Sequence, residues 1–419
     1  MSQQSTPTTE VVVLGAGYAG LLATVRLARK LRGRPVRITL VNPTDTFTER
    51  LRLHQYATNQ TVKWRSIPET LRGMGVRFVQ ARVTRLLPER RAVIVSAGGQ
   101  EQALSYDYLV YALGSDIDRQ SVPGVAGHAY TLTPRGERSA GALRDVLPAL
   151  NAAGARVVVC GGGPTGLETA AEFATSYPRL KVRLVTEGAL GAQFGKGVAR
   201  YMRRTIARAG VTISDHTSVA EVRADGVVTG DGTVIPAELV LWAGGFAVPP
   251  VAREAGLEVN ARGQIVVDPV LRSRSHPAIY AIGDAADPAE RPGAPVRMSA
   301  VVASVMGAAG ADSLSATLRG RRPRPFSFVY LGQAIALGRG RAIAFNNFPD
   351  DVPVPPFLTG RFGYLGRDLF VRYFAAAARL ERRRFGSFYW PGRGRYAAQQ
   401  RRNGGARPAA SGARSPRAA

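Results

Sequence analysis

The stretch VVVCGGGPTGLETAAEFA, residues 157–174, has the order of an apolar strand, a glycine-rich turn and an amphipathic helix. A related stretch, EVVVLGAGYAGLLATVRLA, occupies residues 10–28. In such units one glycine permits the tight turn, a second lets the backbone approach a pyrophosphate, and a third lets the helix lie close to the strand. The sequence therefore predicts the α/β class, with two Rossmann-like dinucleotide-binding domains.

The predicted nucleotide contacts lie in these two turns, where free N–H groups at the start of a helix attract phosphate. They are Gly15, Ala16, Gly17, Tyr18, Ala19 and Gly20 in the first turn and Gly161, Gly163, Pro164, Thr165 and Gly166 in the second. The alternative for either turn is a tight glycine bend without a ligand, but two complete strand–turn–helix units in one chain argue against it.

Length and composition indicate a multi-domain globular protein, since the chain has 419 residues and 45% hydrophobic residues. The single cysteine, Cys160, excludes an internal disulfide, a redox-active cysteine pair and a cysteine-ligated metal cluster. Redox chemistry must then use a bound cofactor, and no metal site is expected. The first ten residues lack the pattern of an export signal, and no apolar run approaches the roughly 20 residues of a membrane span, so we expect a cytoplasmic protein.

The formal net charge of +26 comes mainly from arginine, and the arginines crowd toward the C-terminus. From residue 361 onward only Asp368 and Glu381 are acidic. No helix-turn-helix, zinc-finger or zinc-knuckle pattern accompanies this charge, so specific nucleic-acid binding is not expected.

The residue at the end of the next strand distinguishes the coenzymes, because a carboxylate there accepts bonds from the ribose hydroxyls of adenosine. In the second unit Glu187 holds this position and favours NADH over NADPH, since it would repel a 2′-phosphate. In the first unit the position is Asn42, whose amide can also bond a hydroxyl. A turn role for Asn42 with Pro43 is the alternative.

Two further segments, YDYLVYALGS at 106–115 and PAIYAIGDAA at 277–286, read as strands that end in small-residue turns. Together with the glycine turns they resemble the FAD/NAD(P)-binding pyridine nucleotide-disulfide oxidoreductase superfamily. The resemblance implies FAD in the first site, with Asp284 bonding the ribityl chain at the start of a helix that points toward the flavin. It also implies cofactor contacts at Gly114, Gly245 and Gly283.

Within that superfamily, GGGPTGLETAAEFA resembles the nicotinamide-site helix of type II NADH:quinone oxidoreductases and their apoptosis-inducing-factor-like relatives. LVNPTDTFTERLRLHQYA, residues 40–57, resembles the segment that lines their isoalloxazine. The resemblance implies hydride transfer from NADH to FAD, with Glu168 in the first turn of its helix as an orienting or proton-relay residue. A partner of the helix dipole is the alternative for Glu168, and Glu172 is expected to pack or form a salt bridge.

Other candidates carry weaker signals. Val83 is expected to present its backbone to adenine, and Gln55 to bond the flavin or its ribityl chain, with a surface polar role as the alternative. His54 is expected to be an ordinary packed or exposed histidine, because no metal-type ligands cluster around it. For Trp242 core packing is the prediction.

The electron acceptor is predicted to be a quinone, although the two glutamines usual in the relatives' quinone-tunnel helix are replaced by apolar residues in AVVASV, 300–305. Arg297, Met298 and Ser299 would face the flavin and could suit another acceptor. The alternatives are a soluble reductase of a ferredoxin- or rubredoxin-type protein and a slowly turning-over redox sensor that holds FAD and NADH.

Residues 364–390 mix helix formers, aromatics and arginines, which is typical of an interfacial helix attracted to anionic lipid on the cytoplasmic membrane face. A homodimer-forming or body-packed helix is the alternative. The expected FAD-binding domain is discontinuous, over 10–118 and 264–318, and the NAD(P)H-binding domain spans 119–263. A C-terminal cap with the basic helix covers 319–390, and a disordered basic tail covers 391–419.

Overall fold

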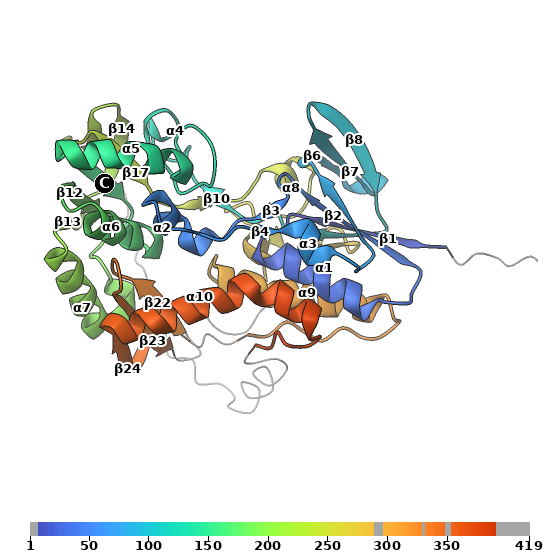
Figure 1. The fold of residues 1–419 in the computed structure, drawn as a ribbon. Helices are drawn as coiled ribbons and strands as arrows, with labels where there is room; N and C mark the ends of the chain where they lie inside the picture. Colours follow the sequence, from blue (N-terminus) through green and yellow to red (C-terminus); the bar gives the residue numbers. More distant parts are fainter. Residues whose placement is uncertain (1–6, 289–295, 329–331, 348–352, 391–419) are drawn as a thin grey trace, which may run out of the picture.

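The computed structural model describes residues 7–288, 296–328, 332–347 and 353–390. Two parallel sheets, each with helices beside it, form the two ends of an elongated molecule, and a long C-terminal helix runs along both (Figure 1). The predicted α/β class is confirmed. The tail predicted to be disordered lies outside the described residues.

The first sheet contains the first glycine turn and has the strand order β20-β9-β1-β2-β5, with every neighbouring pair parallel. Its strands are β1 (Thr9–Leu14), β2 (Val36–Asn42), β5 (Val76–Gln80), β9 (Tyr108–Tyr111) and β20 (Ile279–Ala281). The run Val11–Leu14 is at most 2% exposed, because a parallel strand covered on both faces needs apolar side chains in both directions. Late residues of the chain thus complete a sheet begun by its first residues.

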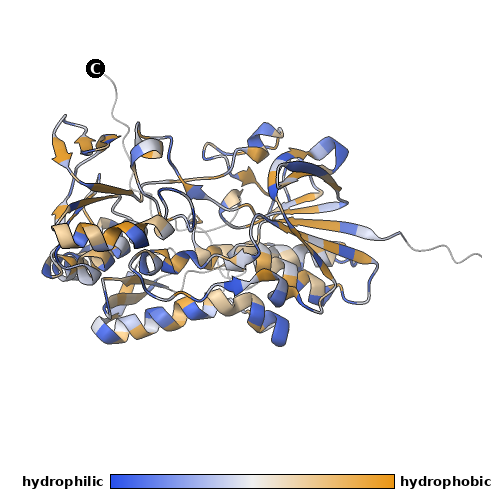
Figure 2. Ribbon diagram, turned by 45° about the horizontal axis from the view of Figure 1, so that its top comes forward, coloured by the Kyte–Doolittle hydropathy of each residue, from blue (hydrophilic) through white to orange (hydrophobic). Residues whose placement is uncertain are grey.

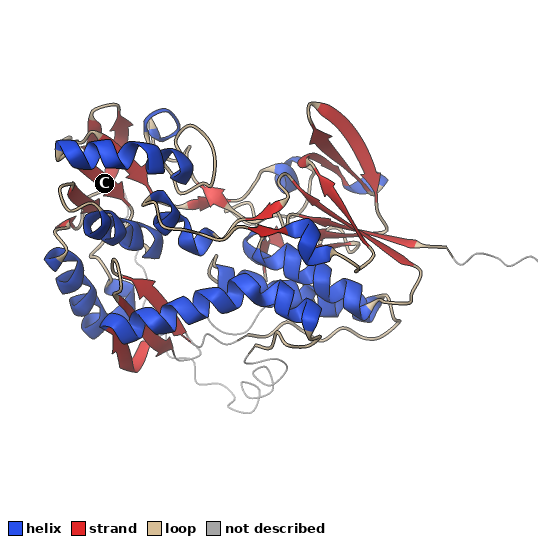
Figure 3. Ribbon diagram, in the orientation of Figure 1, coloured by secondary structure: helices blue, strands red, loops and turns tan. Residues whose placement is uncertain are grey.

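Helices and a second, antiparallel sheet cover the two faces of this first sheet (Figure 3). The helices are α1 (Tyr18–Lys30) and α9 (Ala300–Thr317); the strands are β6 (Arg82–Leu87), β7 (Ala92–Ala97) and β8 (Gln100–Ser105). The helix α9 is long and apolar enough to span a membrane, but 72% of it is buried in the protein. It packs so closely on α1 that a Cβ at Gly307 would overlap the carbonyl of Ala19. We therefore interpret α9 as a core helix.

The second parallel sheet contains the second glycine turn, in the order β13-β12-β11-β17. Its strands are β11 (Arg156–Cys160), β12 (Lys181–Val185), β13 (Thr212–Ser214) and β17 (Leu239–Trp242). The neighbouring helices are α5 (Ala140–Ala153), α6 (Pro164–Ser176) and α7 (Gly195–Arg208), and an antiparallel sheet forms from β14 (Val219–Arg223), β15 (Gly226–Thr229) and β16 (Val234–Pro236). The chain enters and leaves this half through two short strands that pair with each other, β10 (Asp116–Ile117) and β18 (Phe246–Ala247).

The C-terminal region joins the two halves. An antiparallel sheet of β22 (Gly332–Ala336), β23 (Ala342–Asn347) and β24 (Pro353–Thr359) leads into α10 (Gly360–Arg383). Hydrophobic and hydrophilic residues alternate along α10, the lowest helix in Figure 2. Its apolar face packs Val371 and Phe374 against the body, whereas Phe362, Leu365 and Leu369 are 78%, 66% and 69% exposed. The helix is thus body-packed on one side and apolar toward solvent on the other.

A buried ion cluster fixes α10 to the first half. Arg26 of α1 bonds Asp312 of α9 through Nε at 2.7 Å and Glu381 of α10 through Nη1 at 2.7 Å. Arg26 and Glu381 are 2% and 0% exposed. A buried charge that loses its partner is strongly destabilising, so this cluster specifies one seating of α10.

Candidate active site

The first glycine turn joins β1 to α1 and has the geometry that a pyrophosphate turn needs. Gly15 has φ +93°, and a Cβ there would overlap the carbonyl of Ala112; a Cβ on Gly20 would overlap the carbonyl of Gly15. At Gly17, by contrast, nothing lies within 4 Å of the position that a Cβ would take. The turn therefore closes tightly against its own strand and leaves open space at one point, beside the N-terminus of α1.

The second turn joins β11 to α6 and repeats this geometry. Gly161 has φ +120°, and a Cβ there would lie 2.8 Å from the Ala243 carbonyl carbon. A Cβ on Gly166 would overlap Gly161, whereas Gly163 again faces open space. Pro164 and Thr165 are the first two residues of α6.

A cavity of about 380 Å³ opens at the carboxyl ends of β11, β12 and β17, beside the second turn. Its lining includes Gly161, Glu187, Trp242 and Gly245. Glu187 is exposed, two residues beyond the end of β12, and the buried indole Nε1 of Trp242 has no hydrogen-bond partner among the described residues. Because nucleotides bind at the carboxyl ends of parallel strands, the position and the donor set fit the adenosine half of NADH.

Trp242 and Cys160 both contribute to this wall. Trp242 is 7% exposed and packs into the core of the second half, as predicted. Burial raises the pKa of the Cys160 thiol to about 12, so this thiol stays protonated and unreactive at neutral pH.

Asn42, at the end of β2, uses its side-chain amide in hydrogen bonds within the protein. Its Oδ1 accepts the backbone N–H of Ala16 at 2.9 Å, and its Nδ2 donates to the carbonyl and the hydroxyl of Thr44 at 2.8 Å and 3.2 Å. These bonds fix the first turn to the next strand end, which is the turn role considered as the alternative for this residue. Only the second lone pair of Oδ1 is left to meet a ribose hydroxyl.

Asp284 lies on a short 3-10 helix, η4 (Gly283–Ala285), where β20 ends. Its Oδ2 accepts the hydroxyl of Ser115 at 2.7 Å, and its buried Oδ1 has no partner in the described residues. Burial raises the pKa of this carboxyl, and the hydrogen bond from the Ser115 hydroxyl opposes this effect only in part. An orphaned buried acceptor at the carboxyl edge of the first sheet fits a hydroxyl-bearing chain such as ribityl.

The helix expected directly after Asp284 does not form there. The chain continues from η4 into β21 (Ala286–Asp287), and α9 begins only at Ala300 with Ser299 as its N-cap. The sequence DAADP breaks the helix early, because Asp287-Pro288 follows at once. The prediction that a helix starts at Asp284 was therefore wrong.

The remaining predicted flavin contacts surround the same edge. Gly114 and Gly283 both have positive φ, +70° and +72°. The hydroxyl of Tyr18 is buried without a hydrogen-bond partner in the described chain, and burial raises its pKa. Ala19 packs beneath Gly283. Val83 lies on β6, paired with Val95 next to a β-bulge.

The segment Arg50–Gln55 connects the two halves. Arg50 donates from Nη1 to the carbonyl of Ser115 at 2.8 Å, beside Asp284. Four residues on, His54 lies in the short helix α2 (Leu53–Ala57), with its Nδ1 3.9 Å from the Oε2 of Glu168. One segment, exposed at Arg50 and buried from Leu53 to Gln55, thus reaches from the flavin-side carboxyl to the start of the second βαβ helix.

Gln55 is 2% exposed, so the surface role considered for it is wrong. Its Oε1 accepts Arg52 Nη1 at 3.0 Å, and its Nε2 lies 3.4 Å from the hydroxyl of Tyr364 on α10. His54 is packed, as predicted. Burial first, and then the guanidinium groups of Arg367 and Arg52, hold the pKa of His54 well below its ordinary value.

Glu168 is held by two donors from the C-terminal region. Its Oε1 accepts the backbone N–H of Ala336 at 2.8 Å and Arg367 Nη2 at 3.0 Å. It is the fifth residue of α6, one turn later than predicted, and no acidic residue lies in the first turn. Its carboxylate therefore pairs with a buried arginine, which differs from the helix-dipole role.

Arg367 was missed by sequence reasoning. It is 2% exposed, also donates to the carbonyl of Leu51 at 3.0 Å, and keeps two N–H positions, Nε and Nη1, without a partner in the described residues. The signal was its place on α10: it shares the buried face with Val371 and Phe374, where an arginine requires a partner. The sequence places it in the segment 364–390, whose arginines are expected to meet anionic lipid.

Glu172, one turn after Glu168, packs as predicted. It is 1% exposed and accepts Gln60 Nε2 at 2.6 Å and Ser176 Oγ at 2.8 Å, with Arg339 at 3.7 Å. Burial raises its pKa.

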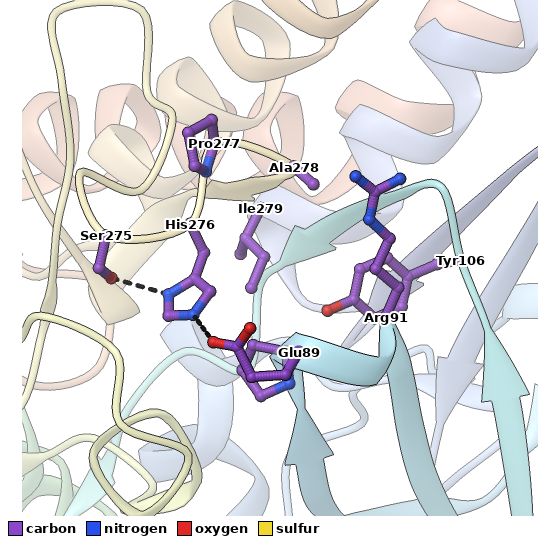
Figure 4. A pocket seen from close by; sticks show the side chains of 9 residues that line it. Glu89, Arg91, Tyr106, Ser275, His276, Pro277, Ala278 and Ile279 are labelled. Atoms are coloured by element: carbon purple, nitrogen blue, oxygen red, sulfur yellow. Dashed lines mark hydrogen bonds and ion pairs between the residues drawn. The ribbon is translucent and has the colours of Figure 1, made fainter.

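A second cavity, of about 350 Å³, lies away from this site (Figure 4). It opens at the amino ends of β9 and β20, between Tyr106, Arg91 and His276, whose Nε2 lies 3.3 Å from Glu89. The nucleotide turns are at the opposite, carboxyl edge of the same sheet, so this cavity takes no part in the candidate site.

Comparisons with known proteins agree with this architecture. The family model of the pyridine nucleotide-disulphide oxidoreductases matches residues 9–307. The chain is 29% identical to the demethylphylloquinone reductase NdbB of Synechocystis, over 80% of this chain and 85% of that protein. It is 26% identical to the type II NADH:quinone oxidoreductase of Haemophilus influenzae, over 80% and 86%. Among solved structures, NDH2 from Plasmodium falciparum in complex with NADH superposes with a TM-score of 0.74 at 16% identity, over 90% of this chain and 99% of that one.

The family match covers both glycine turns, the Ser115–Asp284 pair and Glu168, and these are the parts that the geometry joins into one site. The protein is therefore an oxidoreductase that binds FAD and NADH and belongs to the pyridine nucleotide-disulphide oxidoreductase family.

Proposed function

We propose that this protein is an FAD-dependent NADH dehydrogenase that passes two electrons to a quinone. The observation that carries the proposal is the segment Arg50–Gln55, which links the flavin-side pair Ser115–Asp284 to Glu168 of the NADH-side helix. The names of the similar proteins, a demethylphylloquinone reductase and a type II NADH:quinone oxidoreductase, support a quinone as the acceptor.

FAD, when bound, takes a hydride from NADH and passes the electrons on. The chain has only one cysteine and therefore no redox-active cysteine pair that could carry these electrons. The protein's own part is to hold and orient. We assign the open space at Gly17 and Gly163 to the two pyrophosphates and Asp284 Oδ1 to a ribityl hydroxyl. The sheet memberships support the division into an FAD domain (10–118 and 264–318), an NADH domain (119–263) and a cap (319–390). Val251, Ala252 and Leu257, however, pack into the core of the first half, so we place the end of the NADH domain near β18.

Glu168 and Arg367 act as a unit in this proposal. Arg367 holds the Glu168 carboxylate in place, and its Nε and Nη1 hydrogens are donors that suit the carbonyl oxygens of a quinone. Arginine keeps its proton at any working pH, so the protons that a quinol needs must pass through another group, and we assign this relay to the Glu168 carboxylate.

Arg367→Met and Arg367→Lys test this assignment. We expect Arg367→Met to raise the KM for quinone at least about tenfold, the value of one or two lost charged hydrogen bonds. Flavin reduction by NADH should change less, and the lysine variant should recover part of the loss. Equal losses in both half-reactions would instead indicate a purely structural arginine.

The overall activity is tested by mixing the purified yellow protein anaerobically with NADH and then with a panel of acceptors. Rapid flavin bleaching followed by steady turnover with a short-chain quinone is the expected result. Turnover only with a ferredoxin- or rubredoxin-type protein would favour the soluble reductase, and bleaching without turnover the redox sensor. The absence of bleaching would contradict all three.

We further propose that the exposed apolar residues of α10 rest on the cytoplasmic membrane surface. Phe362, Leu365 and Leu369 recur at helical spacing on one side of α10, and the exposed Arg361 and Arg372 flank them, as in interfacial helices. Replacing the three apolar residues by serine should abolish binding to lipid vesicles. If the variant instead converts a dimer to a monomer in light scattering while vesicle binding is unchanged, the face is a dimer interface.

A further inference from the structure

The helix α7 carries a row of cations on its outer face. Lys196, Arg200, Arg204 and Arg208 follow one another at intervals of four residues, and all are exposed. The opposite face buries Val198, Met202 and Ile206 in the core of the second half, and the helix contains no acidic residue.

The row has no partner in the part of the chain that the structure describes. The neighbouring Arg203 pairs with Asp215, whereas no ion pair or side-chain hydrogen bond joins any of the four residues of the row to another described residue. Like charges four residues apart destabilise a helix. No ion pair in the described part of the chain offsets the repulsion within the row, so binding of an external anion would relieve it.

The row lies beside the exposed apolar residues of the C-terminal region. Tyr201 of α7 accepts the backbone N–H of Gly360, the first residue of α10, at 3.0 Å. Gly197 of α7 faces Phe357 of β24. Leu358 of β24 is 54% exposed and Phe362 of α10 is 78% exposed. The helix α7, the strand β24 and the start of α10 lie at one corner of the molecule (Figure 1).

We propose that the α7 row binds the phosphates of anionic phospholipids and forms a second, electrostatic contact of the membrane-docking surface. The inference rests on the proposed position of α10 at the membrane. An anionic bilayer is the partner that satisfies both neighbours at once, because it offers an apolar phase next to a dense layer of phosphates, which guanidinium groups bind in a bidentate manner. Docking through α7 would also fix how the NADH half sits relative to the membrane.

The test is cosedimentation of the full-length protein with phosphatidylcholine vesicles, with and without phosphatidylglycerol. The variant replaces all four residues of the row by glutamine. The control replaces four exposed arginines of the first half by glutamine, so that both proteins lose the same charge. These arginines are Arg77, Arg90, Arg253 and Arg262. We expect the row variant to bind anionic vesicles at least about tenfold more weakly, since each basic residue near such a surface contributes up to about fivefold.

Binding to neutral vesicles should be unchanged in the row variant, and the control should bind anionic vesicles nearly as the parent protein does. Equal losses in both variants, or none in either, would overturn the proposal. Retained vesicle binding with lost binding to an acidic carrier protein would also overturn it, in favour of a protein partner. Turnover with a water-soluble short-chain quinone should be normal in every variant, so failure here is distinct from failure of the proposed enzyme function.

Discussion

The two glycine turns share one backbone design and differ in what surrounds them. In both, the first glycine has positive φ and the third touches the first, while the middle one faces open space. At the end of the next strand, Asn42 is bonded to the first turn through Ala16 and Thr44. Glu187, at the corresponding place in the second half, is exposed on the wall of a cavity.

This difference separates retention from exchange. Around the first turn, buried polar atoms of Tyr18 and Asp284 that lack partners in the described chain await a ligand, and leaving them unpaired costs free energy. The second turn opens to solvent through its cavity. The same local geometry thus suits a permanently bound FAD in one half and a transiently bound NADH in the other.

Replacing the middle glycine of either turn by valine should have the largest effect on the contrast between bound FAD and exchanging NADH. A Cβ at Gly17 or Gly163 has no neighbour within 4 Å, so the branched side chain of valine would extend into the space beside the helix N-terminus. Gly17→Val should yield a protein depleted of flavin, whereas Gly163→Val should stay yellow with NADH-dependent bleaching slowed at least about a hundredfold, the value of a few kcal/mol of lost binding. Stopped-flow absorbance measures both.

Gly127→Val, at another open glycine position, is the control and should match the parent protein. Normal bleaching in the Gly163 variant would contradict the assignment of the second turn to NADH.

Removing the flavin-side carboxylate should have the next largest effect. Asp284→Ala loses the bond from Ser115 and the free Oδ1 acceptor, and FAD should dissociate about ten- to a hundredfold more readily, as for one or two hydrogen bonds to a charged group. Flavin fluorescence released on dialysis measures the change. Ser115→Ala should have a smaller effect, and an Asp284 variant that keeps its colour as the parent does would show that the carboxylate holds no cofactor.

The exposed carboxylate of the second half should control coenzyme choice. Glu187→Gln removes the repulsion of a 2′-phosphate, so kcat/KM with NADPH should rise about tenfold, for a charge contact near the surface of roughly 1 kcal/mol or slightly more. NADH kinetics should change little. Unaltered NADPH kinetics would place the adenosine ribose away from Glu187.

The smallest effect concerns pH and the segment between the halves. Since the pKa of His54 is depressed in the folded protein, the unfolded chain binds a proton first as pH falls below about 6.5, and stability decreases by at most about 1.4 kcal/mol per pH unit from there down to the folded pKa. Above that pH the residue contributes no dependence. His54→Gln should flatten the acid side of a urea-unfolding profile, and parallel profiles for both proteins would contradict a buried neutral histidine.

Much of the architecture follows from local sequence. Apolar strands, glycines at fixed spacing and helical stripes are set by interactions between near neighbours, so both βαβ units could be predicted. The prediction of a helix at Asp284 was wrong because a helix cannot continue through Asp287-Pro288. The prediction of a surface role for Gln55 was wrong because α10 covers this residue. The ligand contacts of the site residues stay predictions.

The sequence by itself determined the two nucleotide turns, the presence of a single cysteine and the basic C-terminus. Only the tertiary structure decided that Arg367, some 200 residues after Glu168, becomes its partner, and that Arg26 fixes α10 through Glu381. Buried charges need partners, and helix packing supplies these partners from distant parts of the chain. The spacing of residues along the sequence therefore does not predict which charges pair. The same packing left one face of α10 and the cations of α7 at the surface, without partners among the described residues.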